Sequence, residues 1–256
     1  MKVMQKLDGV ALFGGDEREA RSLIIRRMEA GEQTVLYTPN PVMMENARRM
    51  PRLKAALCRA DINLPDGIGV VLAARCLGLA VSQRISGVDV AGDVLSLAAR
   101  FGWRVFFLGG RAGVAEQAAE RMKAKHPQLL ICGTRDGYFS RESEAVAQIR
   151  AASPDVLFVC LGSPKQELWI DRYRRELRDV RLLMGLGGTL DVLSGCVARA
   201  PVWMQRAGLE WLWRMAREPR RMRDLPKMAI FMGRMMGKGI RNLVILHIQD
   251  RKKNPF

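Results

Sequence analysis

Residues 103–125, WRVFFLGGRAGVAEQAAERMKAK, contain the clearest fold signal in the chain. The short apolar run at 104–108 is typical of a buried strand, and a helical pattern at 112–125 follows Gly109 and Gly110. Five further strand-like runs, separated by helical segments, occur at 34–37, 62–64, 129–132, 156–161 and 181–184. This alternation predicts an α/β fold, with a Rossmann-like parallel sheet covered by helices on both faces.

Capping residues predict several helix boundaries. Asp16 is expected to cap a helix that ends at Gly31, and another helix is expected at 68–77. The segment 84–87 is predicted to be a loop, with Asp89 capping the helix that follows it.

The chain has 256 residues and a net charge of +16, which is unevenly distributed. Strand-like patterns end near residue 195, which predicts a core at 1–195, with lobes at about 1–100 and 101–195, and a basic helical appendage at 196–256. The appendage contains 14 Lys and Arg against 4 Asp and Glu, a net charge of +10. Such a segment is expected either to contact an anionic partner or to present a solvated charged face.

Composition excludes several classes of protein. Apolar residues make up 48% of the chain, which is too many for a disordered protein. No apolar run approaches the ~20 residues of a membrane-spanning helix, and the run at 10–13 is too short for a signal peptide, so a cytoplasmic location is expected. Five isolated cysteines and two histidines argue against a disulfide framework and a zinc cluster.

Polar and glycine-rich residues follow the predicted strands. Ligands bind beyond the carboxyl ends of the strands in open α/β sheets. Each segment alone is compatible with ordinary turn chemistry, but six at one end of a sheet indicate a binding site. They are Thr38-Pro-Asn40, Pro65-Asp66-Gly67, Gly109-Gly110, Asp136-Gly-Tyr138, 162–167 (which contains Gln166) and 185–191 (which ends at Asp191).

Individual residues in these segments are assigned candidate roles. Gly109 and Gly110 precede a helix N-terminus, which favours a nucleotide phosphate. Asp66 is the candidate general base, because histidines are scarce and a carboxylate on a turn can project into a cleft. Its spacing equally permits a cap for the helix at 68–77. No D-x-D pair occurs, so neither a metal nor another cofactor is expected, and arginines would stabilise a leaving diphosphate.

The C-terminal segment from 227 to 246 has the pattern of a basic amphipathic helix. Lys227, Arg234, Lys238 and Arg241 share one helical face. Apolar residues fall largely on the opposite side, at Met228, Met232, Met235, Met236, Leu243 and Leu246. The pattern predicts either a segment lying on an anionic membrane surface or a helix packed on the core with its basic side chains in water.

Five ordered motifs resemble the WecG/TagA/CpsF glycosyltransferases, over a region from about residue 33 to Arg221. They are Thr38-Pro-Asn40, 64–69 (LPDGIG), 136–139 (DGYF), 162–167 (GSPKQE), and Arg199-Ala-Pro201 with 208–211 (GLEW). The resemblance implies an inverting transferase that moves a sugar, foremost N-acetylmannosamine, from a UDP-sugar to undecaprenyl-diphosphate-linked GlcNAc at the inner face of the cell membrane, in the synthesis of teichoic acid or a similar surface polysaccharide. UDP-glucose and UDP-N-acetylmannosaminuronic acid are the alternative donors.

The resemblance also implies roles for particular residues. Asp66 matches the family's proposed base. The positions matching the substrate pocket are Thr38, Asn40, Arg84 and Gln166, to which the residues after the strands add Asp191, Gly109, Gly110 and Tyr138. The positions among which the diphosphate-binding arginines fall are Arg214, Arg220, Arg221 and Arg223.

Two functions from other classes compete with this reading. The basic charge, with tryptophans near arginines in the appendage, is compatible with a nucleic-acid-binding protein. The expected partners nevertheless do not include a nucleic acid. A dinucleotide-dependent oxidoreductase would use Asp136 as its ribose ligand. The sequence leaves the oligomeric state open, a homo-oligomer included.

Overall fold

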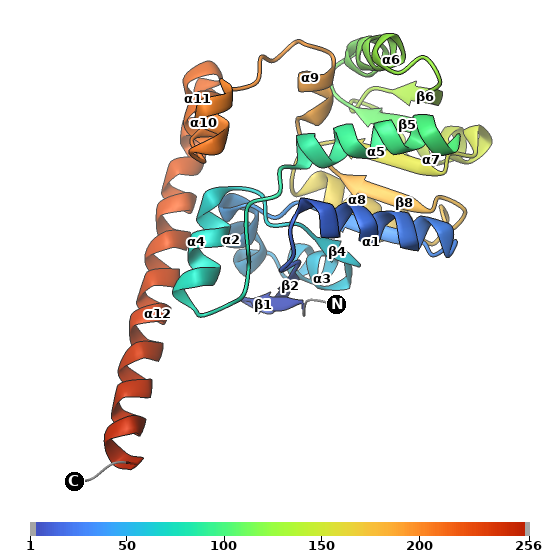
Figure 1. Cartoon of the computed structure of the whole chain (residues 1–256). Helices are drawn as coiled ribbons and strands as arrows, with labels where there is room; N and C mark the ends of the chain where they lie inside the picture. Colours follow the sequence, from blue (N-terminus) through green and yellow to red (C-terminus); the bar gives the residue numbers. More distant parts are fainter. Residues whose placement is uncertain (1–3, 254–256) are drawn as a thin grey trace.

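The computed structural model describes residues 4–253, and the side chains of Arg220 and of 243–253 lie outside the described part. An α/β body is flanked on one side by a long C-terminal helix (Figure 1). Six parallel strands form its sheet in the order β4-β3-β8-β7-β5-β6, which confirms the predicted fold class. Their bounds are β3 (Thr34–Tyr37), β4 (Ile62–Asn63), β5 (Arg104–Gly109), β6 (Leu130–Arg135), β7 (Val156–Cys160) and β8 (Leu182–Gly185).

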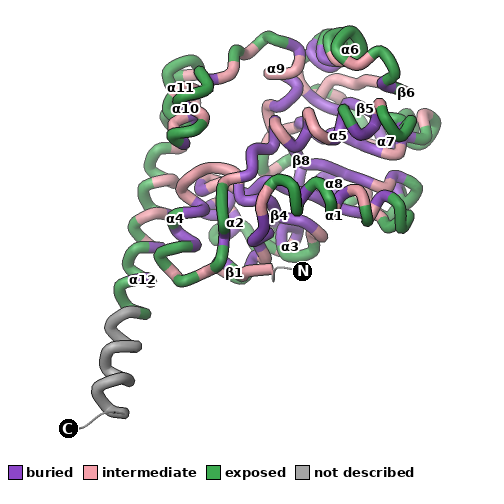
Figure 2. The backbone as a smooth tube through the Cα atoms, viewed as in Figure 1, coloured by how far each residue is buried: buried purple, intermediate pink, exposed green. Residues whose placement is uncertain are grey.

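Side chains alternate between two core clusters, one on each face of the sheet. In β5, Val105 and Phe107 join one cluster, whereas Phe106 and Leu108 join the other. Strands β3, β4, β7 and β8 are buried along their whole length and β5 is buried after Arg104, whereas the edge strand β6 is only partly buried (Figure 2). The helices of the first face are α1 (Glu17–Glu29), α5 (Gly87–Phe101) and α6 (Val114–Lys125), and those of the second are α2 (Pro41–Arg49), α3 (Pro51–Arg59), α7 (Glu142–Ala152) and α8 (Lys165–Tyr173).

The predicted caps have different outcomes. Asp16 caps α1 and forms a capping box with Glu19. Asp89 does not cap α5, because that helix already begins at Gly87, after Ser86. The Asp89 carboxylate instead pairs with Arg199, a contact that the local sequence pattern does not contain.

A small hairpin, β1 (Gln5–Leu7) and β2 (Val10–Leu12), lies outside the main sheet. Its turn residues Asp8 and Gly9 have φ values of +52° and +87°, which suit the short turns that join antiparallel strands. Leu7, Val10 and Leu12 are buried in the second cluster, so the hairpin extends the core beyond the sheet.

None of the residues after 195 that the structure describes is in a strand, and most of them are in helices. After α9 (Thr189–Leu193), the elements are α10 (Val202–Arg206), α11 (Glu210–Arg217), the 3₁₀ helix η1 (Pro219–Asp224) and α12 (Leu225–Lys253). The predicted helix at 227–246 is therefore part of a longer one. A Cβ atom at Gly239 would lie 2.7 Å from the Cys76 carbonyl oxygen, at the end of α4 (Ile68–Cys76). Glycine at this position allows α12 to pack closely on α4.

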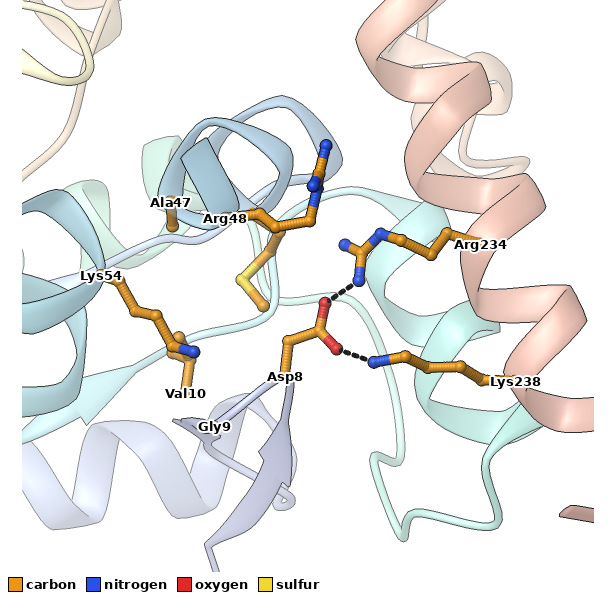
Figure 3. A pocket seen from close by; sticks show the side chains of 9 residues that line it. Asp8, Gly9, Val10, Ala47, Arg48, Lys54, Arg234 and Lys238 are labelled. Carbon is orange, nitrogen blue, oxygen red and sulfur yellow. Dashed lines mark hydrogen bonds and ion pairs between the residues drawn. The ribbon is translucent and has the colours of Figure 1, made fainter. Parts of the chain in front are cut away.

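The basic residues of α12 do not form one solvated face, which corrects that prediction. Arg234 and Lys238 bind the two carboxylate oxygens of Asp8 at the tip of the hairpin (Figure 3). Arg234 also pairs with the buried Glu45. Phe231 is fully buried in the second cluster. The helix is anchored to the body through both its apolar and its basic side chains.

The side of α12 that faces away from the body is apolar. Ile230, Met236 and Ile240 are 43%, 54% and 62% exposed. Of the predicted apolar stripe, Met235 is buried, while Leu243 and Leu246 lie outside the described side chains. None of the helices in the described part of the chain is long and apolar enough to cross a membrane.

Candidate active site

The six polar segments predicted after the strands lie at the same end of the sheet, because all six strands are parallel; the segments after β4 and β6 lie at its two opposite edges, and the other four lie between them. The chain leaves β5 through α6 on one face and β7 through α8 on the other, so a crevice is expected beyond these two neighbouring strands. Gly109, with φ +130°, closes the end of β5, and a Cβ atom there would lie 2.3 Å from the Cys160 carbonyl oxygen. Close approach of the two strand ends therefore requires glycine at this position.

Asp66 lies on the loop after β4. Its backbone N–H donates to the Pro39 carbonyl at 3.0 Å, which fixes this loop beside the loop after β3. Its carboxylate Oδ1 accepts from Arg84 Nε at 3.2 Å, and the side chain is 29% exposed. The alternative role as a helix cap is wrong, because α4 begins after Gly67 and has no side-chain cap. Asp66 is thus held in place yet open to a ligand.

Arg84 connects Asp66 to the appendage. The side chain is 16% exposed, and its Nη2 donates to Glu210 Oε2 at 2.5 Å. Burial acts against the charge of Arg84, but Asp66 and Glu210 outweigh it and raise the pKa of the guanidinium. A permanently cationic group therefore stands beside the candidate base.

Thr38 and Asn40 follow β3 and border the same loop. Thr38 is buried against the start of α5, since a Cβ atom at Gly87 would lie 3.2 Å from its side chain. Asn40 is the N-cap of α2, and its Oδ1 accepts from the Met43 N–H at 2.9 Å. The cap leaves the NH₂ group of Asn40 without a hydrogen bond to any described residue, so this group is available to a ligand.

Gln166 and Tyr138 lie in very different surroundings. Gln166 is 1% exposed and engaged at both ends: it accepts from the Gly187 N–H at 2.8 Å and donates to Glu167 at 2.7 Å. It therefore acts on the site by holding the loop after β8. Tyr138 is 78% exposed beyond the edge strand β6, where its N–H donates to Asp136.

Asp191 and Arg221 meet at the loop after β8. A Cβ atom at Gly188 would lie 3.3 Å from Asp191 Oδ2 and 3.7 Å from Arg221 Nη2. Burial raises the pKa of Asp191, and the nearby Glu218 adds to the effect, while Arg111, Arg221 and other arginines oppose it. Arg111 was not predicted from the sequence, although it directly follows the two glycines after β5.

The predicted diphosphate-binding arginines separate into three groups. Arg214 binds the buried Glu210 at 3.2 Å, and Arg221 pairs with Glu218 at 3.0 Å, so both are held near the site. Arg223 is exposed and has no ion pair with a described residue. Arg220 lies outside the described side chains.

Two cavities differ in their relation to this region. One of about 500 Å³ lies between α4, α10 and the start of α5, and Arg84 and Arg206 are among its lining residues. Another of about 390 Å³ lies beside Asp8 and contains none of the predicted site residues (Figure 3). The described residues include no group of three or more His, Cys, Asp and Glu placed to hold a metal ion.

A sequence comparison matches residues 5–243 to the model of the glycosyl transferase WecG/TagA/CpsF family. The chain belongs to this family. It is 39% identical over 203 residues to an N-acetylglucosaminyldiphosphoundecaprenol N-acetyl-beta-D-mannosaminyltransferase of Bacillus spizizenii, covering 78% of this chain and 79% of the relative. A relative of the same name from Bacillus subtilis is 37% identical over 199 residues, covering 77% of each chain. The protein is therefore a glycosyltransferase, as the motifs predicted.

Proposed function

We propose that this glycosyltransferase moves N-acetylmannosamine from a UDP-sugar to undecaprenyl-diphosphate-linked GlcNAc, with inversion at the anomeric carbon. The names of the two Bacillus relatives support the transferred sugar and the acceptor. The carrying observation is the partly exposed Asp66 carboxylate, held by Arg84 at the end of the sheet where the appendage contributes Arg214 and Arg221. A base and cations at one end of the sheet suit a displacement that develops negative charge on a leaving diphosphate.

The reaction is a single displacement. Asp66 takes the proton of the acceptor hydroxyl as that oxygen forms a bond to the anomeric carbon. The bond between this carbon and the UDP oxygen breaks, and UDP leaves with the electron pair. Arg221, beside Gly188, and Arg111 carry the positive charge that stabilises the departing diphosphate. Gly109 and Gly110 allow the chain to pass close to Cys160 and Val114 where it leaves β5.

The test is a donor screen with a short-chain polyprenyl-diphosphate GlcNAc acceptor. UDP-N-acetylmannosamine, UDP-glucose and UDP-N-acetylmannosaminuronic acid are compared at equal concentration, and the anomeric configuration of the product is read by NMR. Transfer of N-acetylmannosamine with inversion is the expected result. Preference for another donor would mean that the transferred sugar is not N-acetylmannosamine. Retention of the anomeric configuration would exclude Asp66 as the base of a single displacement.

The appendage is proposed to rest on the inner face of the cell membrane. Apolar side chains are exposed on α10, α11, η1 and α12, and exposed arginines accompany them, a combination that suits the membrane interface. The apolar residues are Val202, Trp203, Trp211, Leu212, Met222, Leu225, Ile230, Met236 and Ile240, and the arginines are Arg206, Arg217, Arg223 and Arg241.

Co-sedimentation with phosphatidylglycerol vesicles tests this docking. Serine at both Met236 and Ile240 should release the protein from vesicles at 0.15 M salt without changing turnover on a soluble acceptor. Leu130→Ser is the matched control, since Leu130 is 50% exposed on the edge strand β6. Equal loss of vesicle binding in the control, or no loss in the double variant, would place membrane contact elsewhere.

A further inference from the structure

Glu210 is a buried carboxylate at the start of α11 that contacts three arginines. The residue is 5% exposed. Its Oε2 accepts from Arg84 at 2.5 Å, and its Oε1 accepts from Arg214 at 3.2 Å and lies 3.8 Å from Arg199 Nε. A charge this buried is strongly unfavourable unless it is paired, so its partners are fixed with it.

The surrounding network balances its charges and joins the core to the appendage. Three carboxylates, Asp66, Asp89 and Glu210, face the three arginines. Asp66, Asp89 and Arg84 come from the core, whereas Glu210, Arg199 and Arg214 follow residue 195. Glu210 therefore links the base side of the site to Arg214, one of the predicted diphosphate-binding arginines.

Close packing between the α10–α11 turn and the start of α4 positions the Glu210 carboxylate beside Arg84. Gly208, with φ +72°, makes the turn between α10 and α11, and a Cβ atom there would lie 2.9 Å from Ile68 Cβ. Ile68 begins α4, two residues after Asp66. Because the backbone of this turn contacts the start of α4, the position of Glu210 relative to Asp66 is set by both elements.

The hydrogen bonds of Arg84 indicate that Glu210 prevents a two-bond contact between Arg84 and Asp66. An arginine beside a lone carboxylate frequently forms a paired, two-bond contact that occupies both oxygens. Here Glu210 takes Nη2, and Asp66 receives one bond, from Nε to Oδ1. Asp66 Oδ2 has no hydrogen bond to any residue that the structure describes. A general base needs such a free oxygen to reach the hydroxyl proton.

We infer that Glu210 is a positioning residue, which holds Arg84 in a one-bond contact with Asp66 and thereby keeps one Asp66 oxygen free for the acceptor hydroxyl. The inference rests on the proposed function, in which Asp66 is the base. Through Arg214, the same carboxylate ties this arrangement to a docked appendage.

A double-mutant cycle on the full chain tests the inference. Glu210→Gln keeps the shape and removes the charge, so Arg84 is free to pair with both Asp66 oxygens. We expect kcat to fall about 10²-fold, the scale of a misplaced catalytic group, with little change in the KM for the UDP-sugar. Since Glu210 acts through Arg84, the double variant with Arg84→Gln should be no slower than Arg84→Gln alone. Glu210→Asp, which keeps the charge, should recover part of the loss.

Controls separate positioning from simple stabilisation. Asp155→Asn removes a comparable carboxylate, which pairs with Arg181 at 2.7 Å at the opposite end of the strands, and should leave kcat unchanged. Circular dichroism and thermal melting identify variants that fail to fold, in which case the cycle is run with Glu210→Asp. Additive losses in the cycle, or a loss in KM alone, would overturn the inference.

Parallel measurement of Asp66→Asn distinguishes a failure of the positioning role of Glu210 from a failure of the proposed base. If this variant loses turnover while the Glu210 and Arg84 effects are additive, Asp66 is supported as the base and the positioning role of Glu210 is refuted. If it retains turnover, the proposed base falls, and with it the reason for keeping an Asp66 oxygen free.

Discussion

The α/β body and the C-terminal appendage hold their site residues by different means. In the body, backbone contacts dominate: the Asp66 N–H binds the Pro39 carbonyl, and Asn40 caps α2. In the appendage, ion pairs dominate, since Arg214 is bound by Glu210 and Arg221 by Glu218. Backbone hydrogen bonds do not depend on the protonation of side chains, whereas the partly exposed Arg221–Glu218 pair is weakened by salt and by protonation of its carboxylate. The pair that Arg214 makes with the buried Glu210 is screened less. The base side is expected to be the more rigid, and the diphosphate side the more adjustable.

Removal of the base should have the largest effect. Asp66→Asn keeps the size of the side chain and its place beside Arg84 but cannot accept the hydroxyl proton. Turnover should fall roughly 10²–10⁴-fold, the usual contribution of a general base, while UDP affinity stays near that of the parent protein. Steady-state kinetics and UDP titration measure the two quantities. Near-normal turnover would remove Asp66 from the mechanism.

Loss of the apolar anchor of α12 should have the next largest effect. Phe231 is 0% exposed, so Phe231→Ala should lower the free energy of unfolding by about 3–5 kcal/mol. Met236→Ala is the control on the same helix; Met236 is 54% exposed, and the change should stay within about 0.5 kcal/mol. Urea denaturation of both variants gives the comparison. Similar small losses would mean that α12 contributes little to the stability of the body.

The Asp8 ion pairs should contribute less, and with a defined pH dependence. Burial acts to raise the pKa of Asp8, but bonds to Lys238 and Arg234 outweigh it and lower the pKa below the ordinary value of 3.8. The folded state therefore favours ionised Asp8, and the stabilisation is present above pH 3.8 and is lost as the pH falls through the folded-state pKa.

Asp8→Asn should accordingly lower stability at pH 7 by about 1.5–3 kcal/mol, the range for hydrogen bonds to charged groups. The difference from the parent protein should shrink as the pH falls below the folded-state pKa. Asp93→Asn is the control, because Asp93 and Arg21 form an exposed pair at 3.9 Å. A difference that does not change with pH would mean that the Asp8 charge is not responsible.

Chelation should have the smallest effect, because arginines are proposed to carry the leaving-group charge. Turnover measured with and without EDTA should agree within experimental error, and Arg221→Gln should be the more damaging change. If EDTA abolished turnover and added Mg²⁺ or Mn²⁺ restored it, a metal ion and not the arginines would stabilise the leaving-group charge.

Several features were predictable from local sequence, and one was overlooked. Asp16 caps α1 as its spacing indicated, and the long helix near 227–246 exists despite three glycines. The hairpin at Asp8-Gly9 was missed, although Asp-Gly between alternating apolar residues is a strong hairpin signal. Asp89 was misassigned as a cap because its true partner, Arg199, is 110 residues away in the chain.

The periodicity of the chain determined the parallel sheet and the end at which the site lies, since parallel strands place all their carboxyl ends together. It also gave α12 its two unlike faces, but it did not determine which one contacts the body. That was settled by tertiary structure, which brought Asp8 into contact with Arg234, 226 residues away in the sequence, and Glu210 into contact with Arg84. A buried charge must be paired because an unpaired one is strongly unfavourable. Local sequence patterns cannot identify partners that are so far away in the chain.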